Sequence, residues 1–420
     1  MAAHPQQRLA AFVTAPVYLD HHATTPVDPR VVEAMSPYAF DDFGNASSSS
    51  HVFGWRAEAA VALARENLAA AIGARDPSEI LFTSGTTESD NLALLGTARA
   101  APEKNHLITT AIEHPAVLET SRALKSEGFD LTVLPVDRSG LVDPDAVARA
   151  ITDRTIWVSV MAANSEVGTL QPLAEIGRIC RERAVLFHTD AAQAVGKVPI
   201  DVQDCSVDML SMCAHKLYGP KGIGLLYVGK RRPRVRIRPL VFGGGQEAGR
   251  RSGTLPVSLI VGFAKAVEIC LSERDAEARR LSWLRQMLWK RLSDALGNPI
   301  ANGHLERRLP GTLSVSFPGV SADQLIAALP QVALSAGSAC ASGSPEPSHV
   351  LRAIGLSDEM ARSTLRFGLG RGNDADQIGW VADRLIEVIR ELRGGPDSRP
   401  AATLSSPGVV RNRANACRDN

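Results

Sequence analysis

The chain has 420 residues, of which 45% are hydrophobic and 22% are charged, as in an ordinary globular protein. Its 46 basic residues nearly balance 45 acidic ones, so no overall positive field would hold nucleic acid or an anionic membrane. The best apolar run, at 259–264, is far shorter than the ~20 residues of a membrane helix. The length suits one large domain and one smaller one.

Six cysteines stand at positions 180, 205, 213, 270, 340 and 417, and no two of them form a C-x-x-C pair. A chain of this size needs no disulfides, so reduced thiols in a cytoplasmic protein are expected. The simplest interpretation of Cys180, Cys205 and Cys270 is a small buried hydrophobe. The first 20 residues lack the apolar core of a signal peptide, and a short mitochondrial presequence is the alternative.

Residues 75–270 alternate between apolar, β-rich stretches and helical patterns. The predicted strands are 79–84, 106–112, 130–136, 155–161, 184–189, 207–213 and 222–228, with helices at 88–100, 114–128 and 173–184. Repeated strand and helix predict an α/β domain with a mainly parallel sheet covered on both faces. The Gly-rich turn before the last strand permits one antiparallel strand there.

From about residue 256 the pattern changes to an almost continuous helix that ends near residue 296. Strands at 312–317, 332–337 and 363–369 and helices at 321–329, 347–354 and 375–392 follow, which predicts a smaller α+β domain. We therefore divide the chain into an extension (1–17), a large domain (18–270), a small domain (271–393) and a disordered tail (394–420). The first residues of the large domain are free to pack on the small one.

The segment TSGTTES at 83–89 follows a predicted strand and opens a helix. A helix N-terminus with a glycine and hydroxyl side chains offers unpaired N–H groups to a phosphate. A plain threonine N-cap with Glu88 nearby explains the same residues. The segment alone does not decide between the two.

Two further residues stand at strand ends, where open α/β sheets place their ligands. Asp190, in HTDAAQAVG, can cap a helix or bind a metal, but no His and carboxylate cluster surrounds it at metal-ligand spacing. Lys216, in MCAHKLYGPKGIG, lies beside a histidine and before a Gly-Pro turn, which is unusual for a surface lysine. No P-loop is present, because Lys-Ser/Thr is missing at the required offset.

One chemistry uses all three features. An aldehyde cofactor that carries a phosphate needs a lysine for a Schiff base, a carboxylate for its ring nitrogen and an anion site. Lys216, Asp190 and the Gly85–Thr87 turn supply these groups within one domain. A protonated pyridinium ring is an electron sink, so an amino acid can lose its Cα proton at neutral pH.

With these motifs the chain resembles the group I cysteine desulfurases, which are pyridoxal-phosphate enzymes of the class V aminotransferase family. The likeness covers about 375 residues in order. It includes YLDHHATTPVDPR, FGNASS, TSGTTESDN, EH, EVGT, HTDAAQAVGK, HKLYGPKGIG, GGGQEAGRRSGTLP, SAGSAC, PSHVLRAIG and LRFGLGR. The resemblance implies the aminotransferase fold (fold type I) and pyridoxal 5'-phosphate as cofactor.

The resemblance also implies roles for individual residues. Lys216 would hold the cofactor and carry the Cα proton, Asp190 would pair with the ring nitrogen, and Gln193 would bond the ring oxygen. His114 would stack on the ring, although a solvated loop histidine is its simplest interpretation without the resemblance. The remaining assignments are Thr86, Thr87 and His215 at the phosphate, Thr254 at the phosphate of the neighbouring subunit, and Asn45 and Arg366 at the substrate carboxylate.

Cys340 lies in SAGSACASGS, where every neighbour is Ser, Ala or Gly. The expected reaction needs a thiolate that attacks the sulfur of bound cysteine, leaving alanine and an enzyme persulfide. The thiol must reach the active site and then an acceptor, and small residues permit the many backbone states that this requires. This long loop favours group I over the other desulfurase group.

Two positions depart from the family pattern. Ser165 replaces the second Asn of Asn-Asn-Glu, so the contact of that Asn with cofactor or substrate is in doubt, unless a water fills the gap. Cys213 replaces a Ser that donates to the phosphate, and a thiol is a weaker donor.

The resulting hypothesis is a homodimeric cytoplasmic cysteine desulfurase that needs no metal. Its partners would be L-cysteine, a sulfur acceptor (an iron–sulfur cluster scaffold or a thiolation enzyme) and a transient iron–sulfur cluster at Cys340, with neither membrane nor nucleic acid. Two alternatives are another pyridoxal-phosphate lyase or aminotransferase, such as a selenocysteine lyase, and an inactive scaffold.

Overall fold

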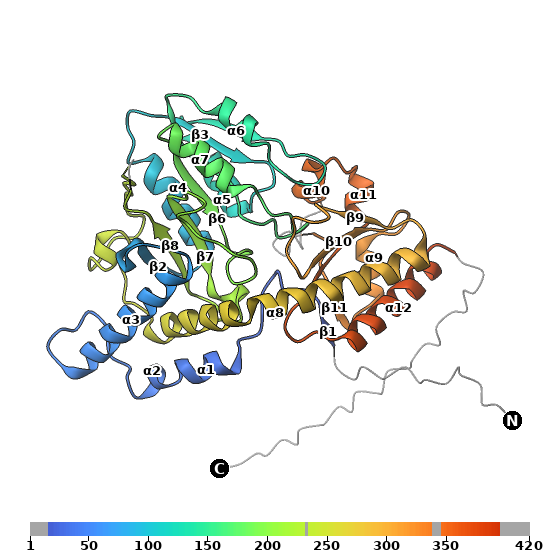
Figure 1. Cartoon of the computed structure of the whole chain (residues 1–420), viewed down its shortest axis with the longest axis horizontal. Helices are drawn as coiled ribbons and strands as arrows, with labels where there is room; N and C mark the ends of the chain where they lie inside the picture. Colours follow the sequence, from blue (N-terminus) through green and yellow to red (C-terminus); the bar gives the residue numbers. More distant parts are fainter. Residues whose placement is uncertain (1–15, 232–233, 338–345, 395–420) are drawn as a thin grey trace, which may run out of the picture.

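The computed structural model describes residues 16–231, 234–337 and 346–394. Its centre is a seven-stranded sheet in the order β2-β8-β7-β6-β5-β3-β4 (Figure 1). The strands are β2 (Ile80–Thr83), β3 (His106–Thr110), β4 (Asp130–Leu134), β5 (Thr155–Ser159), β6 (Leu186–Asp190), β7 (Met209–Cys213) and β8 (Gly224–Val228). Strand β8 is antiparallel to both of its neighbours, and the pairs among β3 to β7 are parallel. The predicted strands, including the one antiparallel strand, are confirmed.

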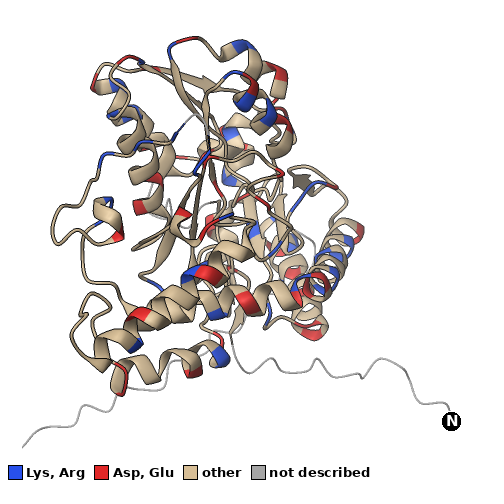
Figure 2. Ribbon diagram, turned by 60° about the vertical axis from the view of Figure 1, so that its left-hand side comes forward, with Lys and Arg blue, Asp and Glu red and all other residues tan. Residues whose placement is uncertain are grey.

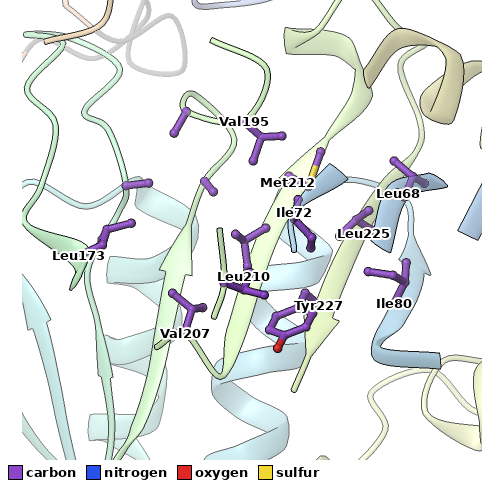
Figure 3. Packing of buried hydrophobic residues seen from close by; sticks show 14 of the residues in the cluster. Leu68, Ile72, Ile80, Leu173, Val195, Val207, Leu210, Met212, Leu225 and Tyr227 are labelled. Carbon is purple, nitrogen blue, oxygen red and sulfur yellow. The ribbon is translucent and has the colours of Figure 1, made fainter. Parts of the chain in front are cut away.

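Alternate residues of the buried strands face two helical layers. One face packs on α4 and α5, through residues such as Leu107 and Trp157. The other face, with Leu210, Leu225 and Tyr227, packs on α3, α7 and the first part of α8 (Figure 3). The helices around this sheet are α3 (Val52–Ala71), α4 (Thr86–Ala98), α5 (Pro115–Ser126), α6 (Pro144–Ala150) and α7 (Leu173–Glu182).

The 40-residue helix α8 (Val257–Leu296) is where the predicted change of pattern begins. Its first half joins the core of the seven-stranded sheet, whereas Leu284, Leu288 and Leu292 join a second core. Figure 1 shows α8 running from α1 (Pro29–Met35), α2 (Pro37–Phe40) and α3 to a position beside α12 (Ala375–Leu392). The sequence predicted α8 and α12 closely, because both keep an apolar stripe at helical spacing.

The second core lies around a three-stranded antiparallel sheet in the order β12-β10-β9. The strands are β9 (Ile300–Asn302), β10 (Thr312–Ser316) and β12 (Thr364–Gly368), and α9 (Ala322–Ala328), α12 and the end of α8 supply the helical part of this core. The buried residues of α10 (His349–Ala353) and α11 (Asp358–Arg362) pack in a separate cluster with Ile112, Met161 and Val167. Strand β1 (Val17–Tyr18) pairs with β11 (Val332–Ala333), so the first described residues pack on this unit. The domain boundary at residue 271 stays a prediction.

The prediction of a strand at 332–337 is wrong in length, because the strand observed there has two residues. Regular pairing stops after Ala333, and Ser335 forms only an isolated bridge with Arg366. Helices α1, α2, α3, α6 and α11 and strands β1 and β9 were not predicted, since most are short or only weakly amphipathic. The expected tail and most of the expected N-terminal extension lie outside the described residues.

The charged residues of the helices are mixed in sign, as the balanced composition requires (Figure 2). Among the described residues, no helix is both long and apolar enough to cross a membrane.

Candidate active site

A cleft of about 430 Å³ opens where the parallel strands end. Asp190 is the last residue of β6, Lys216 closes the short 3₁₀ helix that follows β7, and His114 follows β3. Because parallel strands end at one edge of a sheet, the topology brings together three residues that are far apart in the chain. All three line the cleft, as does Arg366 from β12 of the second unit.

Asp190 is 6% exposed and accepts a hydrogen bond from the Ala192 N–H at 2.9 Å. That bond caps the turn that follows β6 and fixes the carboxylate at the wall of the cleft. Lys216 is half-buried, and no described carboxylate lies within salt-bridge distance of its ammonium. The cleft thus holds a carboxylate and an amine, each able to interact with a bound molecule.

His114 is the N-cap residue of α5, and its Nδ1 accepts a hydrogen bond from the Ala116 N–H at 3.1 Å. Burial lowers the pKa of His114 below its ordinary value. The ring is therefore neutral at pH 7, with its proton on Nε2. Burial, followed by the charge of Lys216, also lowers the pKa of His215 to about 4.

The N-terminus of α4 forms one end of the cleft. Gly85 is its N-cap and supplies no side-chain cap, and the buried hydroxyl of Thr86 has no hydrogen-bond partner among the described residues. Glu88 in the first turn would repel an anion, but it is paired with Arg251 at 2.8 Å. Unpaired backbone N–H groups and an unpartnered hydroxyl fit a phosphate group.

Arg366 is 2% exposed, and its guanidinium is held from three sides. It donates to Asp20 Oδ1 at 2.5 Å, to Ser335 Oγ at 3.2 Å and to the backbone carbonyl of Ser165 at 3.2 Å. Its buried Nε has no partner among the described residues. A fixed arginine with a remaining donor at the cleft fits a carboxylate ligand.

The structure places most, but not all, of the predicted site residues around the cleft. Those that line the cleft are His114, Asp190, Lys216, Thr86, Thr87, His215 and Arg366. Gln193 is buried next to this group, and its side chain bonds the His22 carbonyl and Lys197. Asn45 and Thr254 are exposed and lie outside the cleft, so their roles stay predictions. Cys340 lies outside the described residues.

The residue-by-residue assignments missed His22 and Thr24, which line the cleft, and Asp20, which pairs with a cleft residue. Asp20 pairs with Arg366, His22 bonds Thr312 from β10, and Thr24 bonds His215 at 3.2 Å. All three lie in YLDHHATTPVDPR, which carried part of the resemblance. Their partners are at least 190 residues away, so spacing in the sequence gives no sign of them.

Both departures from the family pattern lie at the cleft. Ser165 lines it and offers its backbone carbonyl to Arg366, a contact that does not depend on the side chain. Cys213 is 1% exposed, and burial raises the pKa of its thiol, so it contributes a neutral group.

Comparisons with known proteins agree with this geometry. Residues 17–381 match the family "Aminotransferase class-V". "Cysteine desulfurase IscS" of Anaeromyxobacter dehalogenans is 52% identical over 94% of this chain and 97% of its own. "Cysteine desulfurase, mitochondrial" of Drosophila melanogaster is 50% identical over 90% of this chain and 82% of its own. The solved structure "SspA in complex with cysteine" is 42% identical, with a TM-score of 0.75 over 84% of this chain and 98% of that one.

The chain therefore belongs to the class-V aminotransferase family, and within it to the cysteine desulfurases. The predicted family, the aminotransferase-like fold and pyridoxal phosphate as the cofactor are confirmed. The residues of the cleft fit that cofactor: an amine, a carboxylate, a neutral imidazole and a phosphate-binding helix N-terminus lie around one space.

Proposed function

We propose that the chain converts L-cysteine to L-alanine and transfers the sulfur to its own Cys340. The observation that carries the proposal is the meeting of Lys216, Asp190, His114 and Arg366 in one cleft. When bound, pyridoxal phosphate supplies an electron sink that weakens the bonds around the substrate Cα. The relatives' names and the cysteine in a similar structure's title support the choice of substrate.

Three residues prepare the cleft for this chemistry. The Lys216 amine would hold the cofactor covalently and would move the Cα proton. The Asp190 carboxylate would hold a proton at the ring nitrogen, since an opposite charge stabilises the protonated form. The neutral imidazole of His114 would lie against the ring and could exchange a proton through its Nε2.

Arg366 binds the substrate carboxylate and orients the substrate. Its guanidinium is already fixed by Asp20, Ser335 and the Ser165 carbonyl, so little side-chain entropy is lost on binding. Asn45 would assist from a position outside the cleft of its own chain. Thr86, Thr87 and His215 bind the phosphate.

The sulfur atom leaves the substrate and is carried away as a persulfide on Cys340. Its thiolate attacks the Sγ of the substrate, an S–S bond forms and the Cβ–Sγ bond breaks. The electron pair of that bond stays on the carbon skeleton, which is protonated and leaves as alanine. A reductant or an acceptor protein then removes the sulfur from the persulfide.

The test is to incubate purified protein with pyridoxal phosphate, L-cysteine and dithiothreitol, and to measure alanine and sulfide. We expect equal amounts of the two products. Cys340→Ala should keep the visible band of bound cofactor and lose both products, while the control Cys205→Ala keeps both. Desulfuration by Cys340→Ala at the normal rate would contradict the assigned role. Keto-acid-dependent amino transfer, or a strong preference for selenocysteine, would favour another enzyme of this fold.

We further propose that the active form is a homodimer. Large apolar side chains are exposed on α2, on the loop that joins α2 to α3, on the start of α3 and on the loop before α8: Phe40, Phe43, Phe53, Trp55 and Phe242. Thr254 is exposed and outside its own cleft, as expected for a residue that reaches a second subunit's phosphate. Light scattering should give twice the chain mass, and Trp55→Glu with Phe43→Glu should weaken the dimer.

The acceptor and the compartment are the finer parts of the proposal. The name IscS among the relatives supports iron–sulfur cluster assembly, with a scaffold protein as acceptor and a transient cluster contact at Cys340. One relative is named mitochondrial, whereas we propose a cytoplasmic enzyme. A pull-down with the persulfide-loaded protein identifies the acceptor and separates a cluster scaffold from a thiolation enzyme.

A further inference from the structure

Lys197 lies in the turn that follows β6 and has no role in the proposed mechanism. The Val195 N–H bonds the Ala191 carbonyl, and the Lys197 N–H bonds the Ala194 carbonyl, so the segment turns like a helix. Residues four apart in such a turn lie side by side. The Lys197 ammonium accordingly donates a hydrogen bond to Gln193 Oε1 at 2.8 Å.

This bond fixes the orientation of the Gln193 amide. On its other side, Gln193 Nε2 donates to the His22 backbone carbonyl at 2.9 Å. An ammonium can only donate and a carbonyl can only accept, so the reversed amide would break both bonds. An amide nitrogen has two hydrogens, and one N–H of the buried Gln193 therefore remains for a third partner.

The surroundings of Lys197 lack a counter-charge. No described carboxylate lies within 4.0 Å of its ammonium, and Lys216 and Arg366 are the cations near enough to repel it. The other titratable groups facing it are the imidazoles of His21, His22 and His215 and the thiols of Cys213 and Cys270. Burial is the larger cause, and Lys216 the next, of a pKa of Lys197 lowered to about 7.

The carboxylates that line a cavity together with Lys197 belong to α8, and each of them is paired with arginine. Glu273 and Glu277 line the same cavity as Lys197. Glu273 pairs with Arg30 and Arg371, and Glu277 pairs with Arg280. A half-buried cation among cations is stabilised when an anion binds nearby, and the ring oxygen of pyridoxal phosphate is such an anion.

We propose that Lys197 is a positioning residue for the cofactor: it fixes the Gln193 amide so that the remaining N–H is available to the cofactor's ring oxygen, and its charge stabilises the anionic form of that oxygen. The inference rests on the proposed function, because it requires the cofactor in this cleft. It assigns a role to a residue that contacts neither the substrate nor the cofactor.

The test compares wild type with Lys197→Met, which keeps the stem but loses donor and charge. Pyridoxal phosphate is titrated into the apoproteins, and the visible band of the bound cofactor is followed against pH. For K197M we expect about a tenfold weaker cofactor affinity. The pH midpoint of the band should rise by about half a unit or more, since a lost positive charge lets the proton near the ring oxygen be held more tightly.

Two further variants separate positioning from a structural effect. Lys197→Gln keeps a donor for Gln193 Oε1 but has no charge, so its affinity should lie between those of wild type and K197M. In a Gln193→Ala background, K197M should reduce the cofactor affinity less than it does in wild type, because there is no amide left to orient. Its effect on the pH midpoint, which depends on the charge of Lys197, should persist. The exposed Lys125→Met is the matched control and should resemble wild type.

Wild-type values for K197M, or an equally large effect of K197M on cofactor affinity in the Gln193→Ala background, would overturn the inference while leaving the proposed function intact. A wild-type protein that acquires no visible band with pyridoxal phosphate would overturn the proposed function, and this inference with it. Comparable thermal midpoints of the apoproteins show that the variants are folded.

Discussion

Two groups of charged residues lie on neighbouring stretches of this chain and differ in how their charges are compensated. Arg371 bonds Asp28 at 2.5 Å and Glu273 at 3.1 Å, and its guanidinium lies 4.2 Å from the ring centre of Tyr218. Two residues before Tyr218, Lys216 has no carboxylate partner among the described residues. Every charge of the first group has a partner of opposite sign within the described protein, whereas the charge of Lys216 has none.

The difference separates charges that hold the fold from charges that bind a ligand. A network in which every charge is paired can link the loop after β12, α8 and the N-terminal segment, and it offers no uncompensated charge to a small molecule. A charge left without a partner raises the free energy of the empty site, and a ligand of matching charge can recover that free energy. Substitutions in the cleft should therefore affect activity, and substitutions around Arg371 should affect stability.

The largest effect is expected for Lys216→Ala. We expect a loss of activity of at least about 1000-fold, because the other described lysine that lines the cleft, Lys221, is exposed. The measurement is the rate of alanine formation, together with the visible band. Lys216→Arg keeps the charge but cannot form a Schiff base, so it should be equally inactive. If it retained activity, charge alone would suffice and the covalent role would be wrong.

Asp190→Asn should lower kcat by about 100-fold, since a neutral amide cannot hold a proton at the ring nitrogen. The bond from the Ala192 N–H to the Oδ1 atom can be kept by asparagine, so the fold should be unaffected. Steady-state kinetics and the thermal midpoint are measured together. If the loss in free energy of unfolding were as large as the loss of activity expressed as a free energy, substitutions in the cleft and around Arg371 would no longer differ in kind.

Arg371→Met should lower the stability of the protein and leave its activity nearly unchanged. We expect it to lower the free energy of unfolding by about 2 kcal/mol, because the buried Asp28 loses an ion pair and the ring of Tyr218 loses the cation that packs on it. Its effect on kcat should be small, and chemical denaturation measures the change. The exposed pair of Arg384 with Glu387 supplies the control, in which Arg384→Met should change stability by less than about 0.5 kcal/mol.

The smallest effect concerns pH. The hydrogen bond from Arg30, together with the charges of Arg30 and Arg371, lowers the pKa of Asp28 from 3.8 to about 2. A carboxyl whose pKa is lower in the folded state stabilises the protein above pH 3.8, and that contribution is lost as pH falls toward 2. The difference in stability between wild type and Asp28→Asn should thus be constant above about pH 5 and shrink between pH 4 and 2. A difference that does not change with pH would show that the charge of Asp28 is not responsible.

The regular elements of the large sheet could be predicted because each carries a local signal. Buried strands such as β5 and β7 are continuous apolar runs, and α8 and α12 keep their periodicity over many turns. Strand β9 has three residues and β1 has two, so neither contains a period to detect. Their pairing depends on partners elsewhere in the fold, and the expected strand at 332–337 ended early for the same reason.

The sequence by itself determined the class of chemistry, because a lysine, a carboxylate and a phosphate-binding turn each follow a strand in a recognisable order. Only the tertiary structure decided how those groups are held. The pairing of Asp20 with Arg366, the contact of Lys197 with Gln193 against the His22 carbonyl, and the completed network of Arg371 all involve a residue from a distant segment. Distances between such residues are set by the packing of strands and helices, which leaves no trace in local spacing.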